Sequence, residues 1–179
     1  VLKIYNEIKH EKFDLIVAIG GGSVMDTAKI FSALLTNPDY AKNILDASLI
    51  INPGIKSVFI PTTAGTGSEA TPNSIVVVPE KELKIGIVNS NFIPDYVILD
   101  AEMTLKLPPS VTASTGIDAF CHAIECFISK KANPFSNMYA LKAISLITGN
   151  IRRAYSDGSD LSARENMMIA AFYGGLCIA

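Results

Sequence analysis

The chain of 179 residues has no tryptophan and only two histidines and three cysteines. The cysteines, Cys121, Cys126 and Cys177, include no CxxC spacing, and their odd number argues against a disulfide framework. We therefore expect them to act as small buried side chains in a reducing cytoplasm. A surplus of charge is also lacking: the net charge is −2, so a basic surface that binds nucleic acid is not expected.

Long apolar runs are missing as well. The longest, such as residues 15–19 and 75–78, are far too short to span a bilayer, and no secretory signal is visible. Hydrophobic residues nevertheless make up 49% of the chain and charged residues 18%, so a sizeable core can form. We therefore expect a folded cytoplasmic protein that binds neither membranes nor nucleic acid.

The first part of the chain mixes strands and helices, which is typical of an α/β fold. Residues 1–12 have the apolar spacing of a helix, and the apolar run at 14–20 predicts a strand buried on both faces, as in a parallel sheet. Three glycines follow. Ser23 can then cap a helix, and the carboxylate of Asp26 suits its first turn. Further strands are predicted at residues 57–60, at 96–99, and at 74–78 and 84–88, which form a hairpin joined by residues 79–83.

After Pro108 no strand pattern remains. We place a domain boundary near residue 107, between an α/β domain at 1–107 and a helical domain at 108–179. No Gly/Ser-rich linker separates the two parts, so we expect them to pack directly on each other. Helices are predicted over residues 110–129, 134–153 and 161–179.

The glycines after the first strand form the first candidate site. Glycine lets the backbone approach a pyrophosphate closely, and the N–H groups at the start of the next helix favour an anion. The stretch at 20–29 has neither the GxGxxG spacing nor the P-loop form. On glycine content alone, a tight turn before a capped helix explains it equally well.

A second candidate site is the loop at residues 62–68, which consists mostly of small hydroxyl side chains and glycines. It follows the second buried strand, and ligands of open α/β sheets lie beyond the carboxyl ends of the strands. The loop is therefore either a second wall around phosphates and a nicotinamide ribose or a surface turn.

A third candidate site lies on the first predicted helix of the second part. Asp118 and His122 are four residues apart, so they share one helix face and can form half of a divalent-metal site. Glu125 falls near the same face. On these residues alone, a hydrogen bond between Asp118 and His122 that satisfies a core histidine is the simpler interpretation.

Taken in order, these stretches resemble the iron-containing (group III) alcohol dehydrogenase family. Each stretch is a weak or moderate signal by itself, but the ordered set is specific and covers nearly the whole chain. The matching stretches are Gly20-Gly-Gly-Ser23 with Asp26 and Lys29, residues 61–69 (PTTAGTGSE), residues 94–100, residues 107–109, residues 116–125 (GIDAFCHAIE) and Asn133-Pro134.

The resemblance implies a Rossmann-like N-terminal part followed by an all-α part. It also implies a homo-oligomeric enzyme that transfers a hydride between NAD or NADP and a small alcohol or aldehyde, with Fe²⁺ or, in some members, Zn²⁺ polarising the substrate oxygen. Asp118 and His122 would be metal ligands. The residues implied in cofactor binding are Gly21, Gly22, Ser23, Asp26, Thr62, Thr63, Thr66 and Lys84.

The departures from the family are absences. The family's metal site has two more histidines further along, whereas here the only other histidine is His10, in the first part of the chain. The first strands of the family, with the acidic residue that helps to select NAD over NADP, are also missing. We therefore expect an internal segment, truncated at both ends and inactive on its own.

Two alternatives remain open at this point. One is an enzyme with other chemistry on the same scaffold, such as a glycerol dehydrogenase or a dehydroquinate-synthase-like lyase. The other is a nucleotide-binding module without catalysis.

Overall fold

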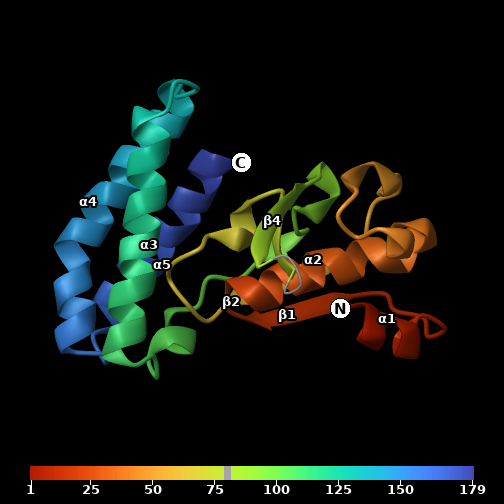
Figure 1. Ribbon diagram of the computed structural model, residues 1–179. Helices are drawn as coiled ribbons and strands as arrows, with labels where there is room; N and C mark the ends of the chain where they lie inside the picture. Colours follow the sequence, from red (N-terminus) through yellow and green to blue (C-terminus); the bar gives the residue numbers. More distant parts are fainter. Residues whose placement is uncertain (79–81) are drawn as a thin grey trace.

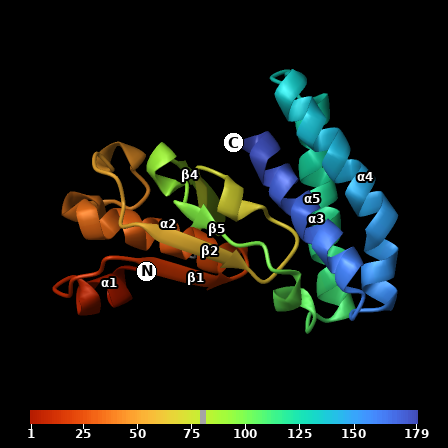
Figure 2. The same ribbon diagram turned by 180° about the vertical axis from the view of Figure 1, so that it is seen from behind.

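The computed structural model describes residues 1–78 and 82–179, so part of the predicted 79–83 connection lies outside the described residues. A mixed α/β part is followed by three long helices, as the sequence predicted (Figure 1). The two parts lie side by side and are joined by a segment that leads from the last strand into the first long helix (Figures 1 and 2). Within the described residues, no helix combines the length and apolar character needed to cross a membrane.

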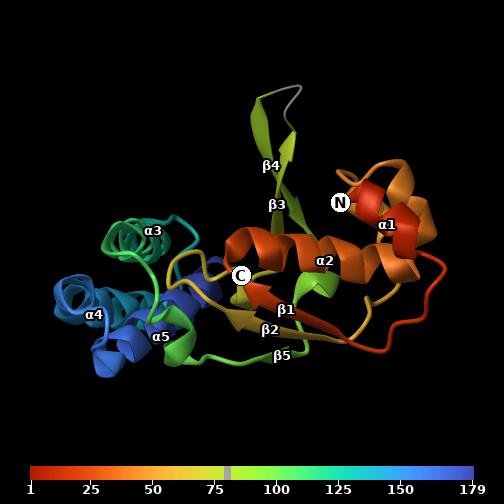
Figure 3. The same ribbon diagram turned by 90° about the horizontal axis from the view of Figure 1, so that it is seen from below.

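The central sheet is parallel and has the strand order β1-β2-β5. Its strands are β1 (Ile16–Gly20), β2 (Ser57–Pro61) and β5 (Tyr96–Val97), and Gly20 lies opposite Pro61 at the carboxyl edge. The helix α2 (Gly22–Thr36) covers one side of this sheet (Figure 3). All three strands were predicted, although β5 is shorter than expected.

The prediction that the first strand is buried on both faces is wrong. Ala18 is buried with Met25 and Ala28 of α2, but Val17 and Ile19 are each 53% exposed. Side chains alternate between the faces of a strand, and among the described residues only the α2 side of β1 is covered. The continuous apolar run thus correctly indicates a strand, but part of its apolar surface stays exposed in this structure.

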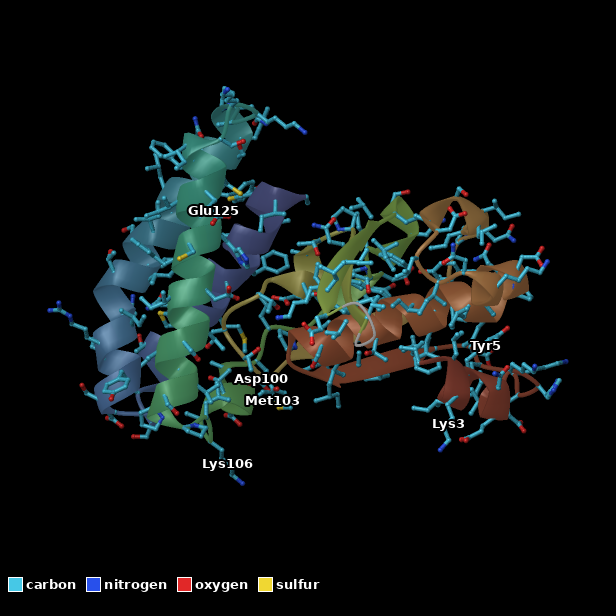
Figure 4. The ribbon with its side chains drawn as sticks, viewed as in Figure 1. Lys3, Tyr5, Asp100, Met103, Lys106 and Glu125 are labelled. Atoms are coloured by element: carbon cyan, nitrogen blue, oxygen red, sulfur yellow. The ribbon has the colours of Figure 1, made fainter. Side chains whose placement is uncertain are left out.

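The rest of the α/β part packs around the other end of α2. The short helix α1 (Leu2–Ile8) buries Tyr5 in a cluster with Ile30, Leu34 and Tyr40. Tyr5 points toward α2, while Lys3 points away from it (Figure 4). Short 3₁₀ turns occur at Pro38–Lys42, Ala47–Leu49, Ser68–Ala70, Ser90–Phe92 and Ala101–Thr104.

The predicted hairpin is present. Its strands are β3 (Asn73–Val78) and β4 (Leu83–Val88), which pair antiparallel with Val78 opposite Leu83. β3 contacts α2, and the hairpin projects away from the central sheet (Figure 3). The hairpin therefore lies next to the start of α2 and forms one side of the cleft described below.

The second part is a bundle of α3 (Pro109–Ile128), α4 (Pro134–Ser156) and α5 (Leu161–Ile178). Small residues such as Ala119, Ala123 and Ala171 form its core with Ile147 and Met167, so the helix axes approach closely. α3 and α5 run in the same direction and α4 runs back between them in the sequence (Figures 1 and 2). All three helices were predicted to within a few residues.

Candidate active site

A cleft of about 490 Å³ opens where the start of α2, the loop after β2, the β3–β4 hairpin and α3 come together. Gly21, Thr62 and Thr63 lie beside this cleft and are not part of its lining. It is lined by the predicted residues Gly22, Ser23, Asp26, Thr66, Lys84, Asp118 and His122, and also by Ser68, Thr71, Asn73, Ile75, Val77 and Ile178.

The helix α2 begins two residues earlier than predicted. Its first residue is Gly22 and its N-cap is Gly21, and no side chain caps it, so the expected cap by Ser23 is not formed. The backbone turns into the helix at the glycines, which makes a serine cap unnecessary. An uncapped helix N-terminus presents backbone N–H groups and the positive end of the helix dipole, which together favour an anion such as a phosphate.

The glycines also let the two predicted phosphate-binding segments touch. A Cβ atom at Gly22 would lie 2.7 Å from the side chain of Thr66, and one at Gly21 would lie 3.3 Å from Oγ1 of Thr63. The backbone N–H of Thr62 donates to the carbonyl oxygen of Gly20 at 2.9 Å. The loop at 62–68 therefore forms a wall directly against the start of α2.

Asp26 does not lie in the first turn of α2, as had been predicted, but is buried one turn further on. Its Oδ1 accepts a hydrogen bond from Oγ of Ser68 at 2.6 Å, and its Oδ2 accepts one from the backbone N–H of Ile75 at 3.1 Å. A buried carboxylate needs such partners. Asp26 thus fastens the loop and the hairpin to α2, with only part of its side chain facing the cleft.

Lys29 is the centre of a polar wall of the cleft, formed with Ser68, Thr71 and Asn73. This role was not predicted from the sequence. It is 1% exposed, and its Nζ donates to the carbonyl oxygens of Ser68 at 2.6 Å, Thr71 at 2.9 Å and Asn73 at 2.6 Å. Burial lowers the pKa of Lys29 to about 8, against the opposing charge of Asp26. A lysine three residues after a buried aspartate was the available signal, but its acceptors lie far along the chain.

The two predicted metal ligands, Asp118 and His122, lie on α3. Oδ1 of Asp118 and Nε2 of His122 are 3.8 Å apart, which is too long for a hydrogen bond, so the alternative of a hydrogen-bonded pair is not realised. Nδ1 of His122 is buried and has no hydrogen-bond partner among the described residues. Both side chains face the same cleft. A carboxylate and an imidazole that are not committed to each other fit a divalent cation such as Fe²⁺ or Zn²⁺.

No cluster of three or more His, Cys, Asp or Glu side chains with metal-binding geometry occurs within residues 1–78 and 82–179. Glu125, which was predicted near the same face, is exposed and lines a different hollow. The described residues therefore offer two candidate ligands, Asp118 and His122. That is fewer than the three protein ligands usual in a catalytic metal site.

The loop at 62–68 also holds the two halves of the cleft together. Gly67 has φ +59°, and a Cβ atom there would lie 2.5 Å from the carbonyl oxygen of Ala171 on α5. A Cβ atom at Gly65 would lie 2.7 Å from the side chain of Thr115 on α3. Glycine is required at such contacts because the backbones approach each other directly. The wall beside the helix N-terminus is thus in contact with the helix that carries Asp118 and His122.

Comparison with known families gives two matches that together cover most of the chain. A family described as "Iron-containing alcohol dehydrogenase" matches residues 1–101. A second description, "Fe-containing alcohol dehydrogenase family, C-terminal", matches residues 112–179.

Individual relatives agree with these matches. The chain is 42% identical over 171 residues to a sulfoacetaldehyde reductase of Bilophila wadsworthia, covering 96% of this chain and 44% of the relative. It is 34% identical to an NAD-dependent methanol dehydrogenase of Bacillus methanolicus, covering 94% of this chain and 44% of the relative. The chain thus spans less than half the length of these curated relatives.

Solved structures show the same fold. An iron-containing alcohol dehydrogenase of Thermotoga maritima superposes with a TM-score of 0.91 at 36% identity, over 99% of this chain and 48% of that one. A sulfoacetaldehyde reductase of Bifidobacterium kashiwanohense, solved with NAD⁺, superposes with a TM-score of 0.86 at 32% identity, over 98% of this chain and 46% of that one.

Proposed function

Because this chain belongs to the iron-containing alcohol dehydrogenase family, we propose that it forms the cofactor cleft and half of the metal site of a metal-dependent, NAD(P)-linked alcohol dehydrogenase. The observation that carries the proposal is the single cleft that holds an uncapped helix N-terminus at Gly22 and the uncommitted pair Asp118 and His122. Hydride transfer needs a cofactor and a polarised substrate oxygen side by side, and this cleft offers a place for each.

In the proposed enzyme a divalent metal ion acts as a Lewis acid on the substrate oxygen, and a nicotinamide cofactor carries the hydride. The carboxylate of Asp118 and an imidazole nitrogen of His122 bind the metal. The backbone N–H groups of Gly22 and Ser23 bind the cofactor phosphates, and Thr66 forms the adjoining wall.

The remaining lining fits this division of roles. Lys84 of β4 is exposed at the edge of the cleft, where its ammonium group binds the cofactor near the ribose. Ile75, Val77 and Ile178 are apolar and keep water from the reacting groups. Asp26 lines the cleft and orients Ser68 and the hairpin beside the cofactor.

The names of relatives support the choice of cofactor and substrate class. The sulfoacetaldehyde reductase was solved with NAD⁺, and the methanol dehydrogenase is named as NAD-dependent. We propose NAD as the cofactor, NADP as the alternative, and a small alcohol or aldehyde as the substrate. Iron follows from the family description, and Zn²⁺ suits the same two side chains.

We further propose that the polypeptide divides near residue 107, that further metal ligands come from outside residues 1–179, and that the whole protein is a cytoplasmic homo-oligomer. With two ligands, the chain alone is expected to bind metal weakly and to turn over no substrate. The chain covers only about 44% of each relative, which supports the proposal that further metal ligands lie outside residues 1–179.

The test uses the whole protein, purified without oxygen, with metal content and NADH-dependent reduction of butyraldehyde as readouts. We expect near-stoichiometric iron and activity that a chelator abolishes. The substitution His122→Ala should remove metal and activity together, whereas His10→Ala, at an exposed position, should remove neither. Full turnover by the His122→Ala variant would refute the assignment.

Two other outcomes separate the alternatives. A metal-free protein that binds NADH and turns nothing over would favour a nucleotide-binding module. Turnover of glycerol or of a sugar-acid phosphate, without reduction of simple aldehydes, would favour a glycerol dehydrogenase or a dehydroquinate-synthase-like enzyme.

A further inference from the structure

A second hollow, of about 510 Å³, lies at the C-terminal ends of α3 and α5. It shares His122 and Ile178 with the cleft, but none of its lining residues belongs to α2. Glu125 marks its position, on the part of α3 that runs beside the end of α5 (Figure 4). Cys126 and Cys177 both line this hollow, and no proposed step of hydride transfer uses them.

The packing of α3 on α5 brings the two cysteines together. A Cβ atom at Gly174 would lie 3.8 Å from Cβ of His122, so these two positions face each other. Because the helices run in the same direction, one turn further along each leads to Cys126 and Cys177. Both thiols line this one hollow, and each contributes to the pKa shift of the other.

The surroundings hold Cys177 in place. Its Sγ lies 3.0 Å from the carbonyl oxygen of Tyr173 and 3.5 Å from that of Ser136. Both cysteines of the pair are free and half-buried, whereas Cys121 is exposed. Burial raises the pKa of Cys177 to about 11 and also raises the pKa of Cys126, so both are thiols at neutral pH and react slowly.

We propose that Cys126 and Cys177 are a redox-convertible pair, which a small disulfide such as oxidised glutathione converts into a disulfide bond between α3 and α5. The odd number of cysteines excludes complete pairing but is compatible with one pair and a free Cys121. The hollow has the volume of many small-ligand pockets.

The reaction is ordinary thiol–disulfide exchange. One protein sulfur attacks a sulfur of oxidised glutathione, a mixed disulfide forms, and one reduced glutathione leaves. The second protein sulfur then attacks the mixed disulfide and displaces the other glutathione. The protein loses two electrons and two protons, and both appear in the two reduced glutathione molecules.

The bond would connect the two helices next to residues of the cleft. Cys126 lies one helical turn after His122, and Cys177 directly precedes Ile178, which lines the cleft. Oxidation therefore fixes Ile178 relative to His122, and reduction releases it. The glutathione pool of a cytoplasm keeps the pair reduced until the disulfide concentration rises.

The test exposes the metal-free protein to oxidised glutathione with a chelator present, so it is independent of the proposed catalytic function. The main variant is Cys121→Ser, which retains the pair. It should give a cross-linked peptide that joins Cys126 and Cys177, and show a Tm higher by roughly 5–10 °C. Cys126→Ser and Cys177→Ser serve as controls, and neither should form a cross-link.

The proposal is overturned if Cys121→Ser, after complete exposure, keeps Cys126 and Cys177 as free thiols, carries glutathione on both of these sulfurs, or joins them only to other molecules. Because that variant keeps both cysteines of the pair, the result does not depend on how well the two single-cysteine controls fold.

Discussion

At the scale of single residues, Lys29 is the side chain on which the polar wall of the cleft depends. Replacing Lys29 by Met leaves three buried carbonyl oxygens without their donor and Asp26 without its nearest cation. Breaking a buried charged network costs about 3–5 kcal/mol, so we expect a loss of that order in the free energy of unfolding, measured with urea. The matched control Lys42→Met breaks only an exposed pair with Asp39 and should cost less than about 1 kcal/mol.

The same substitution gives a pH dependence of definite sign. Burial lowers the pKa of Lys29 from 10.5 to about 8, so between these values the unfolded chain binds more protons than the folded one. The stability contributed by Lys29 therefore rises with pH in this window. The difference in free energy of unfolding between wild type and Lys29→Met should increase between about pH 7.5 and about pH 9. Tyr40, whose pKa burial raises to about 12, affects both proteins alike. A gap that stays constant or narrows contradicts the lowered pKa.

Residue identity alone could predict the parts of the cleft that depend on local chemistry. Gly22 and Thr66 follow strands, and Asp118 and His122 share one helix face, so each pair is visible in the sequence. Lys29 was not predictable in its role, because its acceptors lie 39 to 44 positions further on. The first-turn position predicted for Asp26 was wrong because α2 starts at Gly22, before Ser23, which places Asp26 beyond the first turn.

At the scale of elements, the loop at 62–68 is fixed by its contact with α5. The substitution Gly67→Ala places a Cβ atom 2.5 Å from a backbone oxygen and forces alanine into a left-handed conformation. We expect it to lower the free energy of unfolding by about 2–4 kcal/mol. The control Gly149→Ala lies in an exposed part of α4 with nothing within 4 Å, and should stabilise the protein by about 0.5–1 kcal/mol. Urea denaturation measures both, and equal effects would show that the loop contact is unimportant.

Elements were predicted where their own periodicity decides them. The helices α3, α4 and α5 and the hairpin strands β3 and β4 agree with the sequence to within a few residues, because apolar spacing is a local property. The burial of β1 was not predicted correctly, because it depends on which layers cover the sheet. The helix α2 starts two residues earlier than predicted because glycines, and not Ser23, turn the chain into the helix.

At the scale of the whole molecule, the cleft belongs to neither part alone. The wall proposed to bind the cofactor phosphates comes from α2 and the loop after β2, and the proposed metal ligands Asp118 and His122 come from α3. The contacts of Gly65 with α3 and of Gly67 with α5 keep these halves at a fixed separation. A second open surface, an apolar groove of about 670 Å³ between α1, β1 and α2, contains the exposed Val17 and Ile19. The contacts between the two parts are therefore made within the described residues, whereas apolar side chains of β1 stay exposed to solvent.

This division predicts that cofactor and metal binding can be lost separately. In the whole protein, Gly22→Ala puts a Cβ atom 2.7 Å from the side chain of Thr66, directly at the phosphate wall. We expect the dissociation constant for NADH to rise by roughly tenfold or more, with the metal content unchanged. Asp118→Asn replaces a charged metal ligand by a neutral amide and should lose metal while NADH affinity stays within a factor of about two or three. Fluorescence titration and metal analysis of the same samples measure both quantities. If either variant loses both ligands while its circular dichroism is that of wild type, the two halves of the cleft do not bind independently.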